Sequence, residues 1–265
     1  MKLKLIAAAL ALAAAGSANA AIDKAVSGNG ELFAVVASKS LGYSFVADLG
    51  VKIDDFNTAP AANYMVDMST YGQWASFNAA VAGATDLKFA VIGLDSTGTG
   101  AGLKRMYTTY APGATVTNTT SGNFQTAVTN YDGWITNLTL PGSNAGTDMT
   151  SAVANNGSAY SDSSFTTTYF FGSNASSSLE AAKGKLAFSV LVNAGERANF
   201  GLVATASSPA LKATLNELTT ADQYYWTLNG ADLTYVAAVP EPETYALMLA
   251  GLGLVGFVAR RRKAA

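Results

Sequence analysis

Between residues 21 and 238, short apolar runs rich in aromatic and β-branched residues alternate with clusters of Gly, Ser, Thr, Asn and Asp. Such runs, bounded by turn-forming residues, are typical of β-strands. The pattern predicts strands at residues 31–37, 43–49, 64–68, 87–94, 134–140, 168–171, 185–192, 200–204, 224–228 and 233–237. In the run 185–192 the larger apolar side chains recur at every second position, so we expect residues 186–236 to be the clearest β region.

A tight turn is predicted between the last two strands, where Asn229-Gly230 interrupts the apolar pattern. Residues 224–236 should therefore form a hairpin. Many short strands separated by turn formers predict a mainly β fold, which we expect to be a jelly-roll-like β-sandwich. No repeat of 20 to 50 residues is visible, which argues against propellers and solenoids.

One or two short helices are expected beside the strands. Trp74, Phe77 and Val81 share one face at helical spacing. Ser69 can cap the start of this helix, and Gly83 can end it. Residues 147–155 are a weaker second candidate.

The N-terminus has the three parts of a secretory signal peptide. A basic start is followed by an apolar run over residues 5–15, and then by the small-residue pattern that ends in Ala18 and Ala20. We expect the Sec translocon to export the chain and signal peptidase to cut between Ala20 and Ala21. A membrane anchor is the alternative, but the run is too short to favour it.

The C-terminal tail combines a stiff element, an apolar run and a basic end. Its first part is Val239-Pro240-Glu241-Pro242, in which the prolines enforce an extended conformation. Residues 244–259 carry no charge and would span roughly 24 Å as a helix, against about 30 Å of bilayer hydrocarbon. The tail then ends in a stop-transfer cluster that should stay in the cytoplasm, made of Arg260, Arg261, Arg262 and Lys263. An ordinary C-terminal anchor is the alternative interpretation.

The order of these parts resembles the PEP-CTERM sorting signal of Gram-negative bacteria, and the resemblance is confined to the tail. It implies that a membrane protease of the exosortase type recognises the Pro-Glu-Pro element and cuts near it. The chain would cross the inner membrane once before processing and then reach the cell surface or the medium. Such proteins are typical of bacteria that make exopolysaccharide. The predicted layout is a signal peptide at 1–20, an exported β-sandwich domain at 21–238 and a sorting signal at 239–265.

Charge and composition narrow the chemistry of the exported part. Six of the 16 basic and two of the 18 acidic residues lie in the terminal segments, so residues 21–238 carry a net charge of −6. This balance argues against nucleic acid as a partner. The chain has no Cys and no His, which excludes disulfides, Cys or His zinc sites and every Ser-His or Cys-His catalytic pair. We expect no cofactor and no metal.

No catalytic residue is predicted. Asp54, Asp55 and Asp67 form the closest acidic group, but neighbours in a strand point to opposite faces, so solvated surface is the better interpretation. Residues 131–134 and 229–232 could each lend an oxygen to calcium, yet both lack the spacing of a known calcium loop and are expected to be turns.

Aromatic residues are interleaved with Ser, Thr and Asn between residues 95 and 178. They are either core residues or a surface that stacks on sugars, and they comprise Tyr107, Tyr110, Tyr131, Trp134, Tyr160 and Tyr169. The leading hypothesis is a non-catalytic exported protein associated with the envelope or with extracellular polysaccharide. The alternatives are a glycan-active hydrolase or lyase that uses carboxylates, and a structural matrix or adhesion protein that self-associates through sheet edges.

Overall fold

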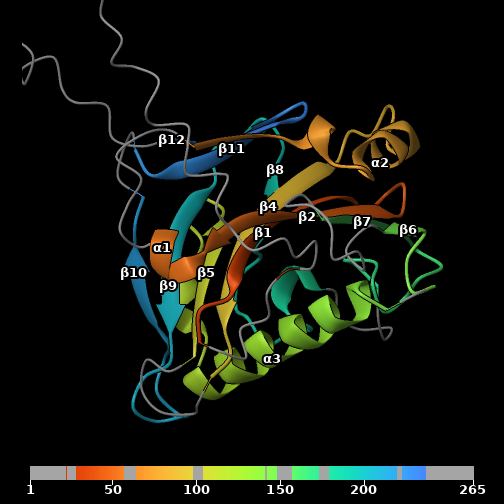
Figure 1. The fold of residues 1–265 in the computed structure, drawn as a ribbon. Helices are drawn as coiled ribbons and strands as arrows, with labels where there is room; N and C mark the ends of the chain where they lie inside the picture. The colour runs from red at the N-terminus through yellow and green to blue at the C-terminus, as the bar shows by residue number, and fades with distance from the viewer. Residues whose placement is uncertain are drawn as a thin grey trace, which may run out of the picture.

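A computed structural model describes residues 22, 28–56, 64–97, 104–140, 142–147, 157–172, 179–219 and 223–236. These residues form three layers (Figure 1). A nine-stranded antiparallel sheet is the middle layer, a three-stranded sheet covers part of one face, and one long helix covers the other. The prediction of a mainly β fold is confirmed, and the strands of both sheets pair in antiparallel fashion.

The large sheet is built mainly from neighbours in sequence. β1 pairs with β2, β4 with β5, β6 with β7 and β9 with β10. Its spatial order is β10 (Thr214–Glu217), β9 (Asn199–Ala204), β5 (Arg105–Tyr110), β4 (Leu87–Asp95), β1 (Glu31–Ser38), β2 (Tyr43–Lys52), β7 (Ser158–Asp162) and β6 (Gly146–Thr147), and β8 (Val192–Asn193) adds to β4. The expected jelly-roll arrangement is therefore wrong, because nine strands lie in one sheet and only three in the other.

The small sheet contains the predicted hairpin. β11 (Tyr225–Asn229) and β12 (Asp232–Val236) are joined by Gly230 and Ala231, and β12 also pairs with β3 (Tyr64–Asp67). Gly230 has a φ of 62°, which a side chain would disfavour and which a tight two-residue hairpin loop requires. The hairpin prediction is confirmed.

Helix α3 (Ser121–Leu138) was not predicted, and it corrects two expectations. It runs for 18 residues, so the helices are not all short, and it includes most of the segment 134–140 that was predicted as a strand. The Thr120 hydroxyl accepts a hydrogen bond from the Asn123 amide and caps its start. Its buried face follows the helical period through Phe124, Val128, Tyr131, Ile135 and Leu138.

The predicted helix near Trp74 exists as α2 (Trp74–Ala80), with Trp74 and Phe77 buried. Ser69 does not cap it, because Ser69 belongs to a separate 3₁₀ turn, Met68–Thr70, that Asp67 caps. Gly83 follows the helix with a φ of 83°, as expected for a helix end. Two further 3₁₀ turns lie at Val116–Asn118 and Leu179–Ala181, and α1 (Ile53–Phe56) is a single turn.

Two other predicted strands are also wrong. Residues 168–171 form turns, and of residues 185–192 only Val192 belongs to a strand. The alternation in 185–192 reflects burial, because Leu186, Phe188 and Val190 fill the core under α3 without a strand partner. Of the weaker helical candidate 147–155, Thr147 belongs to β6 and the rest lies outside the described residues.

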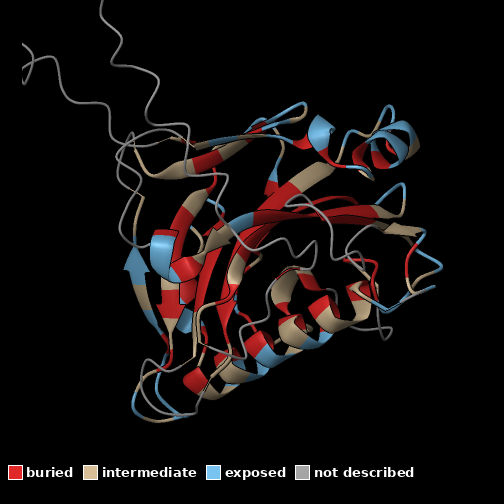
Figure 2. Ribbon diagram, in the orientation of Figure 1, coloured by how far each residue is buried: buried red, intermediate tan, exposed pale blue. Residues whose placement is uncertain are grey.

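The large sheet is buried on both faces, which explains how a chain without disulfides holds a stable body. Its central strands are buried along most of their length (Figure 2), and their alternate residues belong to two different cores. Phe33 and Ile92 pack toward α3, whereas Leu32 and Phe89 pack toward the small sheet and α2.

None of the helices within the described residues is long and apolar enough to cross a membrane. The predicted signal peptide, with Ala18, Ala20 and Ala21, lies outside the described residues. The predicted apolar span at 244–259 also lies outside them.

Candidate functional site

The C-terminal tail leaves the body from β12, the middle strand of the small sheet. Tyr225 is the partner of Val236 in β11, and the Tyr224 amide donates a 2.6 Å hydrogen bond to the Val236 carbonyl. On the other side of β12, Tyr64 of β3 is the partner of Tyr235. Tyr235 thus has a partner strand on each side, and Val236, the last described residue, is paired with β11.

The residues around Val236 are fixed by contacts from other segments. Tyr224 adopts a φ of 61°, which is unfavourable for a residue with a side chain, and its carbonyl accepts a 2.7 Å hydrogen bond from the Thr219 hydroxyl. The Arg197 guanidinium lies 4.5 Å from the centre of the Tyr225 ring. We call Arg197, Tyr224, Tyr225 and Val236 the tail-exit rim. All four are half-buried.

The predicted sorting and stop-transfer residues lie outside the described residues, at Val239, Pro240, Glu241 and Pro242, and at Arg260, Arg261, Arg262 and Lys263. Their distance from the rim is nevertheless limited by the chain. Three residues separate Val236 from Pro240, and an extended chain advances about 3.3–3.6 Å per residue. Pro240 therefore lies within about 14 Å of Val236 along the chain.

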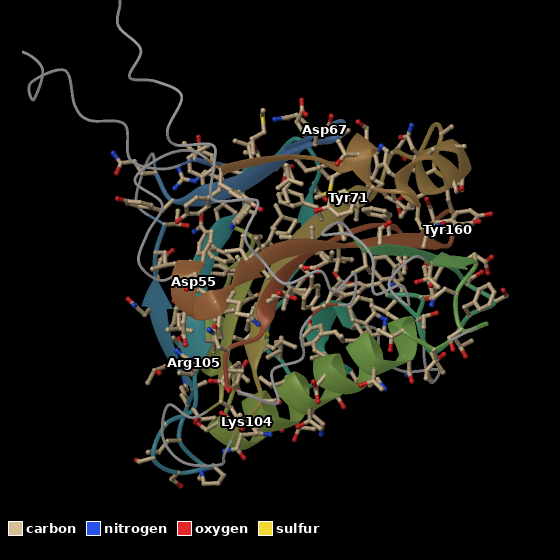
Figure 3. The ribbon with its side chains drawn as sticks, viewed as in Figure 1. Asp55, Asp67, Tyr71, Lys104, Arg105 and Tyr160 are labelled. Atoms are coloured by element: carbon tan, nitrogen blue, oxygen red, sulfur yellow. The ribbon has the colours of Figure 1, made fainter. Side chains whose placement is uncertain are left out.

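Arg105 on β5 gathers two carboxylates at one end of the large sheet (Figure 3). Its guanidinium contacts Asp95 and Asp54 at 3.0 Å each and donates a 3.0 Å hydrogen bond to the Gly28 carbonyl. Burial lowers the pKa of Arg105, but the hydrogen bonds to Asp54 and Asp95 outweigh burial and raise it. The ion pair with Asp54 ties α1 to the sheet, and the hydrogen bond to the Gly28 carbonyl ties residue 28 to it.

The acidic group named in the sequence does not form one site. Asp54 and Asp55 lie in α1, not in a strand, whereas Asp67 ends β3 on the small sheet (Figure 3). Both the hydroxyl and the amide of Ser69 donate hydrogen bonds to Asp67, which lowers the pKa of its carboxyl.

A second acidic side chain, Asp86, fastens the turn between β1 and β2. It accepts hydrogen bonds from the Ser38 hydroxyl at 2.6 Å and from the hydroxyl and amide of Ser40, both at 2.8 Å. Burial raises the pKa of the Asp86 carboxyl, but these hydrogen bonds outweigh burial and lower it to about 2. Asp86 is therefore charged at neutral pH and engaged in local structure.

The suggested sugar-stacking surface is wrong for most of its members. The fully or almost fully buried ones are Tyr107, Tyr110, Tyr131, Trp134 and Tyr169. Tyr131 donates a 2.6 Å hydrogen bond to the Leu179 carbonyl, and the Trp134 indole donates one of 2.8 Å to the Thr168 carbonyl. Only Tyr160, half-buried and stacked on Tyr43, keeps part of its ring exposed.

The buried and half-buried tyrosines have raised pKa values, so their hydroxyl groups are weaker acids than usual. Burial, assisted by the charge of Asp48, raises the pKa of Tyr64 to about 12. Burial, assisted by Asp86, raises that of Tyr169 to about 12 as well. Burial also raises the pKa of Tyr131. These hydroxyl groups stay protonated at neutral pH and act as hydrogen-bond donors.

The two segments considered for calcium have ordinary structural roles. Residues 131–134 lie inside α3, which corrects the expectation of a turn, and residues 229–232 are the confirmed hairpin turn. Within the described ranges, no group of three or more His, Cys, Asp or Glu side chains is placed to hold a metal ion.

Residues 238–263 match the family model of the PEP-CTERM protein-sorting motif. The chain therefore carries this motif at its C-terminal tail, as the sequence predicted. A search of curated proteins found no match. A search of solved structures also found none. The motif implies an exported protein that an exosortase, a membrane protein, processes.

The tail-exit rim is the part of this site that sequence reasoning missed. Arg197 lies far from Tyr224, Tyr225 and Val236 in sequence, and it reaches Tyr225 because Trp226 of β11 pairs with Ala198, the residue after Arg197. The hairpin was a usable signal for Tyr225 and Val236, since their pairing follows from the turn. Nothing in the local sequence indicates the approach of Arg197.

Proposed function

We propose that an exosortase-type protease cuts this exported chain near Pro-Glu-Pro and releases its folded body to the cell surface or the medium. The PEP-CTERM motif at residues 238–263 supports this proposal. The signal-peptide pattern at residues 1–20 gives the consistent topology, with the body translocated and the basic end left in the cytoplasm.

Replacing Pro240 and Pro242 by Ala tests the role of the tail. Without prolines the element loses its enforced extended shape, so processing should be abolished or strongly reduced. Pro112 is the matched control, because it lies in an exposed turn of the body and its change to Ala should leave processing intact. Intact-mass analysis of exported wild-type protein that still ends at Ala265 would refute cleavage.

We further propose that the body is non-catalytic and associates with the envelope or with extracellular polysaccharide. The support is the chemistry of the described side chains. The carboxylates of Asp54, Asp86 and Asp95 are engaged in structural contacts, and buried tyrosines remain protonated. The net charge of −6 favours a neutral polymer over an anionic one.

Mature protein purified from the culture medium provides the test of this second part. It should cosediment with the extracellular polysaccharide of the producing bacterium and leave the polymer length unchanged. Depolymerisation by the same preparation would overturn the non-catalytic assignment and favour a glycan-active hydrolase or lyase. Concentration-dependent assembly without any polysaccharide would instead favour a matrix protein.

A further inference from the structure

We propose that the tail-exit rim, Arg197, Tyr224, Tyr225 and Val236, is a docking surface for the protease that cuts the tail. This inference rests on the proposed function and adds a second recognition element to it. The motif alone would let the protease read any chain with this tail. In this chain only a few residues connect the folded body to the motif, so a protease bound to the motif also contacts the body.

The first step of the argument is the short reach of the chain. Pro240 lies within about 14 Å of Val236 along the chain, and the apolar run from residue 244 begins within about 29 Å. A cleft that binds an extended peptide holds several residues on each side of the bond it cuts. A protease that binds Pro240 therefore has no room to stay clear of the residues around Val236.

The second step is that Val236 cannot simply move away from the body. It belongs to the middle strand of the small sheet, and its carbonyl accepts the 2.6 Å hydrogen bond from Tyr224. The sheet itself is joined to the large sheet by hydrogen bonds of 2.8 and 3.0 Å between Ala198 and Trp226. Detaching Val236 would break its hydrogen bond with Tyr224 and its pairing with Tyr225, so in the intact fold the rim approaches the membrane together with the tail.

The third step is the chemistry of the two ends of β12. The rim holds two tyrosines and one arginine, and the exposed Glu196 directly precedes that arginine in sequence. The opposite end of β12, about 13 Å away, places Asp232 directly opposite Asp67 of β3. Rings that are half-buried and held by neighbours, such as Tyr225 under Arg197, present contact area at little entropic cost. The rim therefore offers better docking chemistry than the acidic end.

The experiment measures processing of the full chain in the bacterium that makes it, by pulse-chase labelling and intact-mass analysis. The first variant is Arg197→Glu, which reverses the charge of the rim. It should slow processing about three- to tenfold, the effect typical of a charge at the margin of an interface. Asp232→Arg is the matched control, since it reverses one charge at the far end of the same small sheet and should leave the rate unchanged.

The second variant leaves every folded residue intact. A twelve-residue Gly-Ser linker inserted between Ala237 and Ala238 separates the motif from the rim. It should slow processing to a similar degree, because the rim no longer accompanies the motif into the protease. Arg197→Glu in the linker chain should cause no further loss, since the contact it disrupts has already gone.

The outcomes separate this inference from the proposed function. Failure of the wild-type tail to be cut would refute the proposed function. If the wild type is cut and both variants are cut at the same rate, the docking surface is overturned while the sorting function stands. Faster cutting of the linker chain would show that the body obstructs the protease, which also overturns docking.

Two further outcomes would show that Arg197→Glu acts on something other than docking of the protease. An equal loss from Arg197→Glu with and without the linker would place its effect in export or folding and not in docking. Binding of the purified mature protein to vesicles of anionic phospholipid, lost in Arg197→Glu, would assign the rim to the membrane surface. Either result overturns the proposal.

Discussion

Gly133 offers a direct test of helix α3, the element that changed the predicted architecture most. It lies in the interior of the helix, is exposed, and has open space where a Cβ atom would be added. Glycine in a helix interior costs about 0.5–1 kcal/mol relative to alanine, because its backbone loses more freedom on folding. Gly133→Ala should therefore raise the free energy of unfolding by about 0.5–1 kcal/mol.

The matched control is Gly195→Ala. Gly195 is also exposed and also has open space for a Cβ atom, but its φ is 83°. A side chain in that left-handed conformation costs about 1–2 kcal/mol, so this variant should be destabilised. The two glycines differ in backbone conformation and not in crowding. Opposite changes in the free energy of unfolding would therefore show that Gly133 has a helical backbone.

Urea unfolding of the mature protein, followed by tryptophan fluorescence and by circular dichroism, measures both variants. Agreement between the two probes supports a two-state treatment. If residues 131–134 instead formed a calcium-binding turn with glycine in a left-handed conformation, Gly133→Ala would destabilise the protein as Gly195→Ala does. A loss of 1 kcal/mol or more in Gly133→Ala would refute the helix at this position.

Three further predictions use the same unfolding assay. Tyr131→Phe removes the hydrogen bond to the Leu179 carbonyl and should lower the free energy of unfolding by about 0.5–1.5 kcal/mol. The loss is modest because that carbonyl still accepts a hydrogen bond from the Ala182 amide. An unchanged midpoint of urea unfolding would contradict the buried hydrogen bond. Arg105→Gln should cost about 1–3 kcal/mol, because it leaves the buried Asp95 without its cation while Asp95 keeps its hydrogen bonds from Thr97. A change below about 1 kcal/mol would refute a stabilising role of the Arg105–Asp95 ion pair. Asp86 has a folded pKa of about 2 against about 3.9 when unfolded, so its contribution is present above pH 4 and lost as the pH falls through 2. Asp86→Asn should therefore flatten the fall in stability between pH 4 and 2, and an unaltered pH profile would refute this role.

The strands that were predicted correctly have signals in their own residues. β1, β2, β4 and β9 are largely apolar because both faces of the large sheet are buried, and Gly230 marks the turn between β11 and β12. β7 and β10 were missed because polar residues occupy at least half of their length, so their pairing with neighbours is the clearer sign that they are strands. β5 was missed although its Tyr and Thr residues are favoured in strands.

The wrong predictions for α3 and for residues 185–192 have a common physical origin. An apolar pattern indicates which residues are buried more directly than it indicates whether the backbone is helical or extended. In α3 the residues between buried positions are mostly Asn, Thr, Asp and Gly, weak helix formers that conceal a regular helical spacing. In residues 185–192 the alternation is real, but the buried side chains fill a core without a partner strand. In both segments, burial of apolar side chains against the large sheet determines the structure more than helix propensity or strand pairing does.

The two recognition elements of the candidate site, the Pro-Glu-Pro element and the tail-exit rim, differ in whether the sequence alone reveals them. The Pro-Glu-Pro element works through contiguous residues whose shape the prolines impose, so it is visible in sequence. The tail-exit rim depends on Arg197 reaching Tyr225, which in turn depends on Ala198 pairing with Trp226 across two sheets. A substrate that carried the tail on a different body would keep the first element and lose the second. The rate at which the protease cuts such a chimera, compared with the native chain, measures how much of the recognition belongs to the fold.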